Sequence, residues 1–138
     1  MAQECIFCKI ANNELPSYKV YEDEFVLAFL DINPTTLGHT LIIPKKHYEN
    51  IFEIEEDVLK KIAGVSKIIA SNMRKNLEDV KGVNIFQSNG LVAEQVIMHY
   101  HMHVIPRRET DSFKINNCLK NLQIEDNKFK EILEKIKI

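Results

Sequence analysis

The chain has 138 residues, of which 45% are hydrophobic and 28% are charged, and its net charge is −2. Such a chain can bury a core of its own as one domain, residues 1–138, and has the composition of a soluble globular protein. The charge gives no basis for nonspecific binding of nucleic acid, and no apolar run is long enough to span a membrane. Because the first ten residues also lack the apolar stretch of a secretory signal, we expect a cytoplasmic protein.

The N-terminal third of the chain predicts one short helix and three strands. Apolar residues at helical spacing define the helix, which ends at about Asn12-Asn13, before Pro16. The strands are the β-like runs at residues 18–21, 25–30 and 39–44. An acidic turn joins the first two strands, so we expect a hairpin there.

The rest of the chain predicts one long helix, two further strands and a C-terminal helix. The long helix runs from about residue 55 to residue 77, with its apolar residues in one stripe: Val58, Ile62, Val65, Ile69 and Met73. Strands are expected at 83–87 and 97–105, with a loop over 88–94 between them. The C-terminal helix has an apolar row that must dock on a surface to be stable: Phe129, Ile132, Leu133 and Ile136.

This succession of elements predicts an α+β fold. Strands that follow one another, with helices set apart, are typical of a mainly antiparallel sheet. We expect five strands, one long helix, and short helices at the N- and C-terminal ends. The core is expected over about residues 5–108, with residues 109–138 as a C-terminal extension.

Three of the five histidines occupy alternate positions in the last predicted strand, at His99, His101 and His103. Side chains alternate between the two faces of a strand, so the three rings share one face while Tyr100, Met102 and Val104 face the core. A row of groups that titrate near neutrality on one sheet face indicates a site.

Two kinds of chemistry fit this row of histidines. The rings could bind a metal, although the outer two Cα atoms of an extended strand are about 13 Å apart and one ion cannot easily collect all three. Alternatively they act on phosphate, where a neutral imidazole attacks phosphorus and an adjacent imidazolium protonates the departing group. Arg107 and Arg108, just past the row, could then add positive charge.

The chain has three cysteines, and an odd number argues against a secreted disulfide framework. Cys5-x-x-Cys8 has the spacing of a redox pair or of half a zinc site, and the βαβ context of a thioredoxin-like redox pair is missing. Cys118 is expected to be a small buried apolar residue with no role of its own.

The segment 99–105, His-Tyr-His-Met-His-Val-Ile, resembles the His-x-His-x-His-apolar-apolar signature of the histidine triad family of nucleotide hydrolases and transferases. Further segments resemble its Hint branch, in the order that branch has them, at residues 7–10, 15–16, 20–23, 28–32 and 38–47. The resemblance covers about residue 5 to residue 108. It implies a HIT-like fold and a homodimer whose two sheets join.

The resemblance also implies an activity. The expected reaction is hydrolysis of nucleoside 5′-phosphoramidates or related nucleoside phosphoesters of the AMP type, purine-preferring, through a covalent nucleotidyl-histidine and without a catalytic metal. Within the same family the alternatives are a diadenosine polyphosphate hydrolase and a nucleotidyl transferase. A nucleotide-binding or interaction module with weak turnover is the alternative from another class.

Each residue that matches the family pattern takes an implied role. His101 would be the nucleophile, with its far nitrogen held by the carbonyl of His99, while His103 would lie at the phosphate and leaving group and His39 would complete the cluster. The other positions would form the base slot (Phe7, Ile10, Phe29, Ile32), bind the ribose (Asp31) and surround the phosphate (Ser88, Gln95, Val96).

Three positions depart from that pattern. Val96 stands where a serine or threonine hydroxyl usually contacts the phosphate or leaving group, and Ser88 stands where many relatives have asparagine. Glu94 stands where glycine is common, and its charge would repel an anionic substrate if it points inward. We therefore expect activity with an altered rate or leaving-group preference.

Bacterial relatives with Cys-x-x-Cys use two histidines to complete a metal site, and both are present here. The resemblance thus implies a structural Zn²⁺ on Cys5, Cys8, His47 and His99, which would hold the N-terminal helix beside the catalytic strand.

Overall fold

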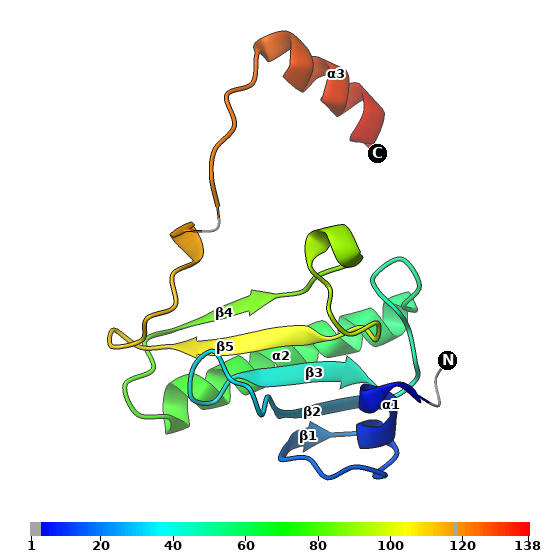
Figure 1. Ribbon diagram of the computed structural model, residues 1–138, viewed down its shortest axis with the longest axis vertical. Helices are drawn as coiled ribbons and strands as arrows, with labels where there is room; N and C mark the ends of the chain where they lie inside the picture. Colours follow the sequence, from blue (N-terminus) through cyan, green and yellow to red (C-terminus); the bar gives the residue numbers. More distant parts are fainter. Residues whose placement is uncertain (1–3, 118) are drawn as a thin grey trace.

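The computed structural model describes residues 4–117 and 119–138, and its centre is one five-stranded antiparallel sheet (Figure 1). The strands are β1 Lys19–Glu22, β2 Val26–Leu30, β3 Thr40–Pro44, β4 Gly82–Phe86 and β5 Met102–Arg107. Their order is β1-β2-β3-β5-β4, so the last strand lies between β3 and the edge strand β4. The predicted hairpin is β1–β2, and the predicted α+β fold class is confirmed.

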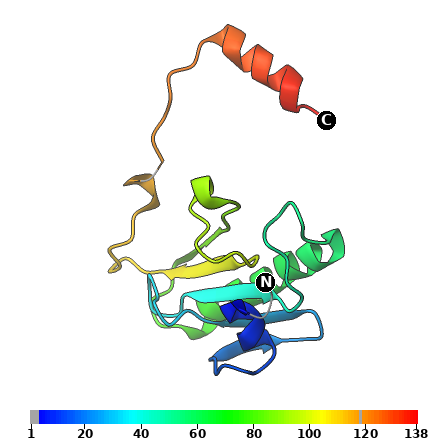
Figure 2. The same ribbon diagram turned by 45° about the vertical axis from the view of Figure 1, so that its right-hand side comes forward.

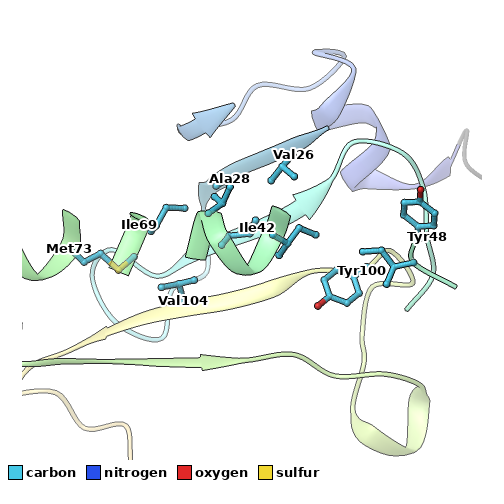
Figure 3. Close-up of a cluster of buried hydrophobic side chains, with 11 residues drawn as sticks. Val26, Ala28, Ile42, Tyr48, Ile69, Met73, Tyr100 and Val104 are labelled. Atoms are coloured by element: carbon cyan, nitrogen blue, oxygen red, sulfur yellow. The ribbon is translucent and has the colours of Figure 1, made fainter. Parts of the chain in front are cut away.

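The described residues form three α-helices beside the sheet: α1 Ile6–Ala11, α2 Glu56–Asn76 and α3 Asp126–Ile136. The long helix α2 lies behind the sheet in Figure 1, and its buried apolar residues belong to the predicted stripe, with Val58 packed at their margin. They meet the side chains of Val26, Ala28, Ile42 and Val104 from the strands (Figure 3). This layer is the larger of the two apolar cores.

The opposite face of the sheet is covered by α1. Phe7 and Ile10 pack there on Leu27, Phe29 and Leu41, which alternate along β2 and β3 with the residues that face α2. Both strands are therefore buried on both faces, which explains why their apolar runs are continuous. The histidines point to this α1 face, so the short N-terminal helix forms one wall of the site.

The strand that carries the histidine row is shorter than expected. It was expected over 97–105, but the ladder to β3 begins only at Met102, opposite Ile42. Before that point side-chain and loop contacts replace the ladder: the ring of His99 bonds the Pro44 carbonyl at 2.8 Å, and the Tyr100 N–H donates to the Tyr48 carbonyl at 2.7 Å. The chain bends at residues 97–99, but the predicted alternation is kept from His99 onward, with Tyr100 in the core on the α2 face.

The C-terminal helix α3 stands apart from the sheet in both views (Figures 1 and 2). Its apolar row is exposed to solvent, so the surface that it was expected to need is not supplied by the described residues of this chain. Cys118 lies outside the described residues. Among the described residues, no helix has both the length and the apolar composition needed to cross a membrane.

Candidate active site

A cavity of about 740 Å³ opens on the α1 face of the sheet, beside the row of histidines. This volume lies within the usual range of small-molecule sites. Most of the predicted site residues line it: Phe7, Ile10, Phe29, Asp31, Ile32, Ser88, Val96, His101 and His103. His39, His99 and Gln95 lie behind this lining.

His101 is held in one tautomer by the backbone of the same segment. Its Nδ1 lies 2.7 Å from the carbonyl oxygen of His99, which can only accept, so Nδ1 carries the proton and donates it. The other ring nitrogen, Nε2, is then a bare lone pair. The ring of Phe7 packs edge-on against this imidazole, with 5.3 Å between centroids, and fixes its plane. His101 thus presents a neutral, oriented nucleophile.

His103 is held in the opposite tautomer through His39. The backbone N–H of Thr35 donates to Nδ1 of His39 at 3.0 Å, so the proton of neutral His39 is on Nε2. That Nε2–H faces Nδ1 of His103 at 2.9 Å and donates to it. The proton of His103 is therefore on Nε2. Two neighbouring rings, 5.1 Å apart between centroids, present a lone pair and an N–H donor respectively.

Burial keeps these rings neutral at physiological pH. Desolvation lowers the pKa of His101 and His39, and it lowers the pKa of His103 to about 4, with a further lowering by the neighbouring His101 and His39. Asp31 opposes the effect only partly; its Oδ2 lies 3.7 Å from Nε2 of His39. A neutral His101 is what nucleophilic attack requires, whereas the lowered pKa of His103 disfavours the imidazolium that was expected beside it.

The remaining walls of the cavity divide into an apolar slot and a polar end. Phe7 and Phe29 meet edge to face at 5.6 Å between centroids, with Ile10 and Ile32 beside them, as expected for a slot that holds a base. Asp31 lies where β2 ends, and its Oδ1 accepts the Asn33 N–H at 2.8 Å. Its carboxylate lines the cavity beyond the slot and is available to hydroxyl groups.

Gln95 does not take the expected place at the phosphate. It is buried, and its amide binds three backbone groups: it accepts the Gly90 N–H and donates to the carbonyls of Glu49 and Ile97. Gln95 therefore braces the loop before the histidines. Val96, next to it, lines the cavity and is 86% exposed, so its side chain is open to ligand.

The two arginines after the row also lie elsewhere. The guanidinium of Arg107 pairs with Asp111 at 2.8 Å and with Asn84, and that of Arg108 donates to the backbone carbonyls of Leu37 and Glu78. Neither residue lines the cavity, and the expectation that they add charge to the site is not met.

Several contributors to the site escaped the sequence reasoning. Phe86 stacks on the ring of His103 at 5.0 Å, and Leu41 and Ser17 line the cavity. Leu41 could have been found from its alternation with Ile42 along β3. The amide of Thr35 carries no side-chain signal at all, because any residue except proline offers the same N–H.

A second cluster lies behind the catalytic row, formed by Cys5 and Cys8 of the α1 region, His47 after β3, and His99. Their four ligand atoms lie within 4.8 Å of one another. Nδ1 of His99 is 3.3 Å from Sγ of Cys5 and 3.5 Å from Sγ of Cys8, and Nδ1 of His47 is 3.3 Å from Sγ of Cys8. Such separations are close to those of a tetrahedral site with metal–sulfur bonds of about 2.3 Å and metal–nitrogen bonds of about 2.0 Å.

A hydrogen bond at Nε2 of His99 leaves its Nδ1 free to bind a metal. Nε2–H donates to the Pro44 carbonyl, so Nδ1 is unprotonated and its lone pair points at the two sulfurs. The ring is fully buried, and desolvation lowers its pKa to about 4, which keeps the lone pair free. Burial, together with Cys5, raises the pKa of the Cys8 thiol to about 11, so a cation is what would stabilise its thiolate. The four residues fit a bound metal ion.

Comparisons with known proteins agree with this geometry. The HIT domain family model matches residues 12–110. An uncharacterised HIT-like protein of Borreliella burgdorferi is 49% identical over 94% of this chain and 93% of its own length. Adenosine 5′-monophosphoramidase HNT1 of Saccharomyces cerevisiae is 41% identical over 78% of this chain and 65% of its own length.

Solved structures of HIT family proteins are also similar to this chain. A HIT family protein of Bacillus subtilis has a TM-score of 0.86 and 41% identity, covering 96% of this chain and 94% of its own. A zinc-bound histidine triad protein of Mycobacterium smegmatis has a TM-score of 0.78 and 37% identity, covering 83% of this chain and 82% of its own. The matched family model spans the whole sheet and the row of histidines, and the chain belongs to the HIT domain family.

Proposed function

We propose that this protein hydrolyses nucleoside 5′-phosphoramidates or related AMP-type phosphoesters through a covalent intermediate on His101. One observation carries the proposal: the lone pair of His101 and the N–H of His103 point from adjacent rings that line one cavity. The phosphoramidase activity of the yeast relative supports the same substrate class.

In the first step, Nε2 of His101 attacks phosphorus and the bond from phosphorus to the leaving nitrogen or oxygen breaks. The new imidazolium keeps its Nδ1–H on the His99 carbonyl, which stabilises the positive charge. Nε2–H of His103 donates to a phosphate oxygen. A departing amine gains one proton from solvent at the cavity mouth, since the aliphatic Val96 has none to give.

In the second step, water attacks phosphorus, the bond to Nε2 of His101 breaks and a proton of the water passes to solvent, which leaves His101 neutral and releases the nucleoside monophosphate. The apolar slot of Phe7, Ile10, Phe29 and Ile32 holds a purine base, and Asp31 accepts hydrogen bonds from the ribose hydroxyls. No step requires a metal at the phosphate.

The test is AMP release from an adenosine phosphoramidate by the wild type and by His101→Ala, with trapping of the acid-quenched enzyme for mass spectrometry. We expect a nucleotidyl adduct on wild-type His101 and a loss of at least about 10³-fold in kcat for the variant. Equal AMP release by the two proteins would remove His101 as the nucleophile. Binding without release by the wild type would favour the nucleotide-binding module.

We further propose that the cluster of Cys5, Cys8, His47 and His99 holds a structural Zn²⁺. The zinc-bound relative and the separations of the ligand atoms support this assignment. The ion would supply no reaction chemistry; it would fix His99, whose carbonyl orients the nucleophile. Metal analysis of purified protein should give close to one equivalent of zinc. Less than about a tenth of an equivalent, with both thiols titratable, would contradict the site.

The protein is also proposed to be a homodimer. β4 is an edge strand with Ile85 and Phe86 exposed, and none of the residues that the structure describes covers the apolar row of α3. Exposed edges and apolar rows of this kind invite a second copy. Light scattering should give twice the chain mass, and a monomer at micromolar concentration would contradict the proposal.

A further inference from the structure

The cavity has an unexpected charge balance for a nucleotide site. Its lining residues, all within the described part of the chain, include two carboxylates, Asp31 and Glu94, and no lysine or arginine. The two histidines in the lining, His101 and His103, present a lone pair and an N–H donor rather than the fixed charge of a lysine or arginine. The side-chain cations that ordinarily meet phosphate groups are thus missing from these walls.

The two carboxylates lie on different parts of the wall. Asp31 lies beside the apolar slot, where its carboxylate accepts hydrogen bonds from the ribose hydroxyls in the proposed complex. Glu94 comes from the loop that precedes the histidines, directly after the short 3₁₀ turn Leu91–Ala93. The slot takes the base and the histidines take the phosphorus, so this loop, with Glu94 and Val96, borders the side from which the leaving group departs.

We propose that Glu94 and Val96 form a leaving-group subsite for a cationic alkylamine, so that the preferred substrates are AMP amidates or esters whose leaving group carries an ammonium. The inference rests on the proposed function. Val96 offers an exposed aliphatic surface to the alkyl stem, and Glu94 offers the counter-charge to the ammonium. The ammonium also balances the single negative charge of the substrate phosphate.

The same walls disfavour a dinucleoside polyphosphate. Such a ligand brings several further negative charges past Glu94, with no lysine or arginine among the lining residues to receive them. Charge repulsion and unpaired phosphates then both weaken binding. The charge balance thus separates the phosphoramidate from the diadenosine polyphosphate within the alternatives that the family allows.

The experiment compares kcat/KM for three AMP amidates of matched chain length, ending in an ammonium, a methyl group or a carboxylate, and for diadenosine tetraphosphate. Wild type is measured beside Glu94→Gln, which keeps the size of the side chain and removes its charge. The matched control is Glu24→Gln, an exposed carboxylate in the β1–β2 turn, outside the cavity lining.

We expect the wild type to prefer the ammonium over the methyl amidate by about threefold to fivefold, the size of an exposed charge pair. The carboxylate amidate and the tetraphosphate should be the poorest substrates. The ammonium-to-methyl ratio should fall to about one in Glu94→Gln and at high salt, and stay unchanged in Glu24→Gln.

A wild-type ratio near one, or the same ratio in Glu94→Gln as in wild type, would overturn the subsite while leaving the phosphoramidase function intact. Turnover of the tetraphosphate as efficient as that of the ammonium amidate would overturn it as well. Failure of the wild type to cleave any amidate would refute the proposed function, and the subsite with it.

Discussion

The buried neutral state of His103 should make the protein less stable in acid. Desolvation lowers the pKa of this ring to about 4 in the folded protein, whereas an unfolded chain has the ordinary value of about 6.5. Between these values the unfolded state binds more protons, so the free energy of unfolding falls as the pH falls from about 6.5 toward 4. Above pH 7 both states are neutral and the effect vanishes.

The size of the effect follows from the two pKa values. From pH 7.5 to pH 5, the shift corresponds to a loss of about 2 kcal/mol from this one residue, and solvent screening at a partly exposed ring reduces this to about 1 kcal/mol. The perturbation is His103→Asn, which cannot titrate and whose Oδ1 can still accept the N–H of His39. His101, His39 and Asp31, which face the ring, are present in both proteins.

The assay is equilibrium unfolding in urea at pH 7.5 and at pH 5, for wild type and His103→Asn. We expect the wild type to lose about 1 kcal/mol more than the variant between the two pH values. Equal losses would show that His103 titrates normally in the folded state, and the reasoning from its burial would be refuted. A larger loss of unfolding free energy in His103→Asn than in the wild type would refute the reasoning as well.

Three further changes test the structure. His39→Ala removes the N–H donor that sets the tautomer of His103 and should lower kcat for an AMP amidate by about tenfold. His39→Gln should restore part of this loss. An unchanged kcat in His39→Ala would contradict the role of the His39–His103 hydrogen bond. Gly38→Ala places a Cβ at φ +103, 3.0 Å from a Leu77 side-chain carbon, and should destabilise the fold by about 1–3 kcal/mol in urea unfolding. Gly64→Ala, in open space on α2, is its control and should stabilise by about 0.5–1 kcal/mol. Ser17→Ala removes a buried hydroxyl that has no partner among the described residues and should raise stability by about 1 kcal/mol; a loss of that size would show that the hydroxyl is satisfied.

The sequence was sufficient to predict that the histidines share one face of the sheet, although the predicted strand was too long. The alternation holds over residues 99–104 although residues 97–99 bend and the ladder to β3 begins only at Met102. What replaces the ladder, the ring of His99 on the Pro44 carbonyl, is a contact between residues 55 positions apart. No local pattern encodes such a contact.

The role of Gln95 could not be predicted for a similar reason. The family resemblance implied that Gln95 reaches the phosphate, but its amide is used by the backbone of its own loop and by the carbonyl of Glu49, 46 residues away. The positions of the protons on the rings of His101 and His103 could likewise not be predicted from the sequence. It depends on the amide of Thr35, which acts through His39 and has no side-chain signature.

The cluster of Cys5, Cys8, His47 and His99 joins segments that are 94 positions apart in the chain, from Cys5 to His99. Closing a loop of that length costs an unfolded chain about 4 kcal/mol of conformational entropy. A metal that stays bound there after unfolding would therefore lower the entropy of the unfolded state and stabilise the fold. His101 follows the last of these residues by two positions. A nascent chain therefore cannot close this loop until synthesis has reached His99, so a metal held there would join the N-terminal helix to the histidine row only after strands β1 to β4 have been synthesised.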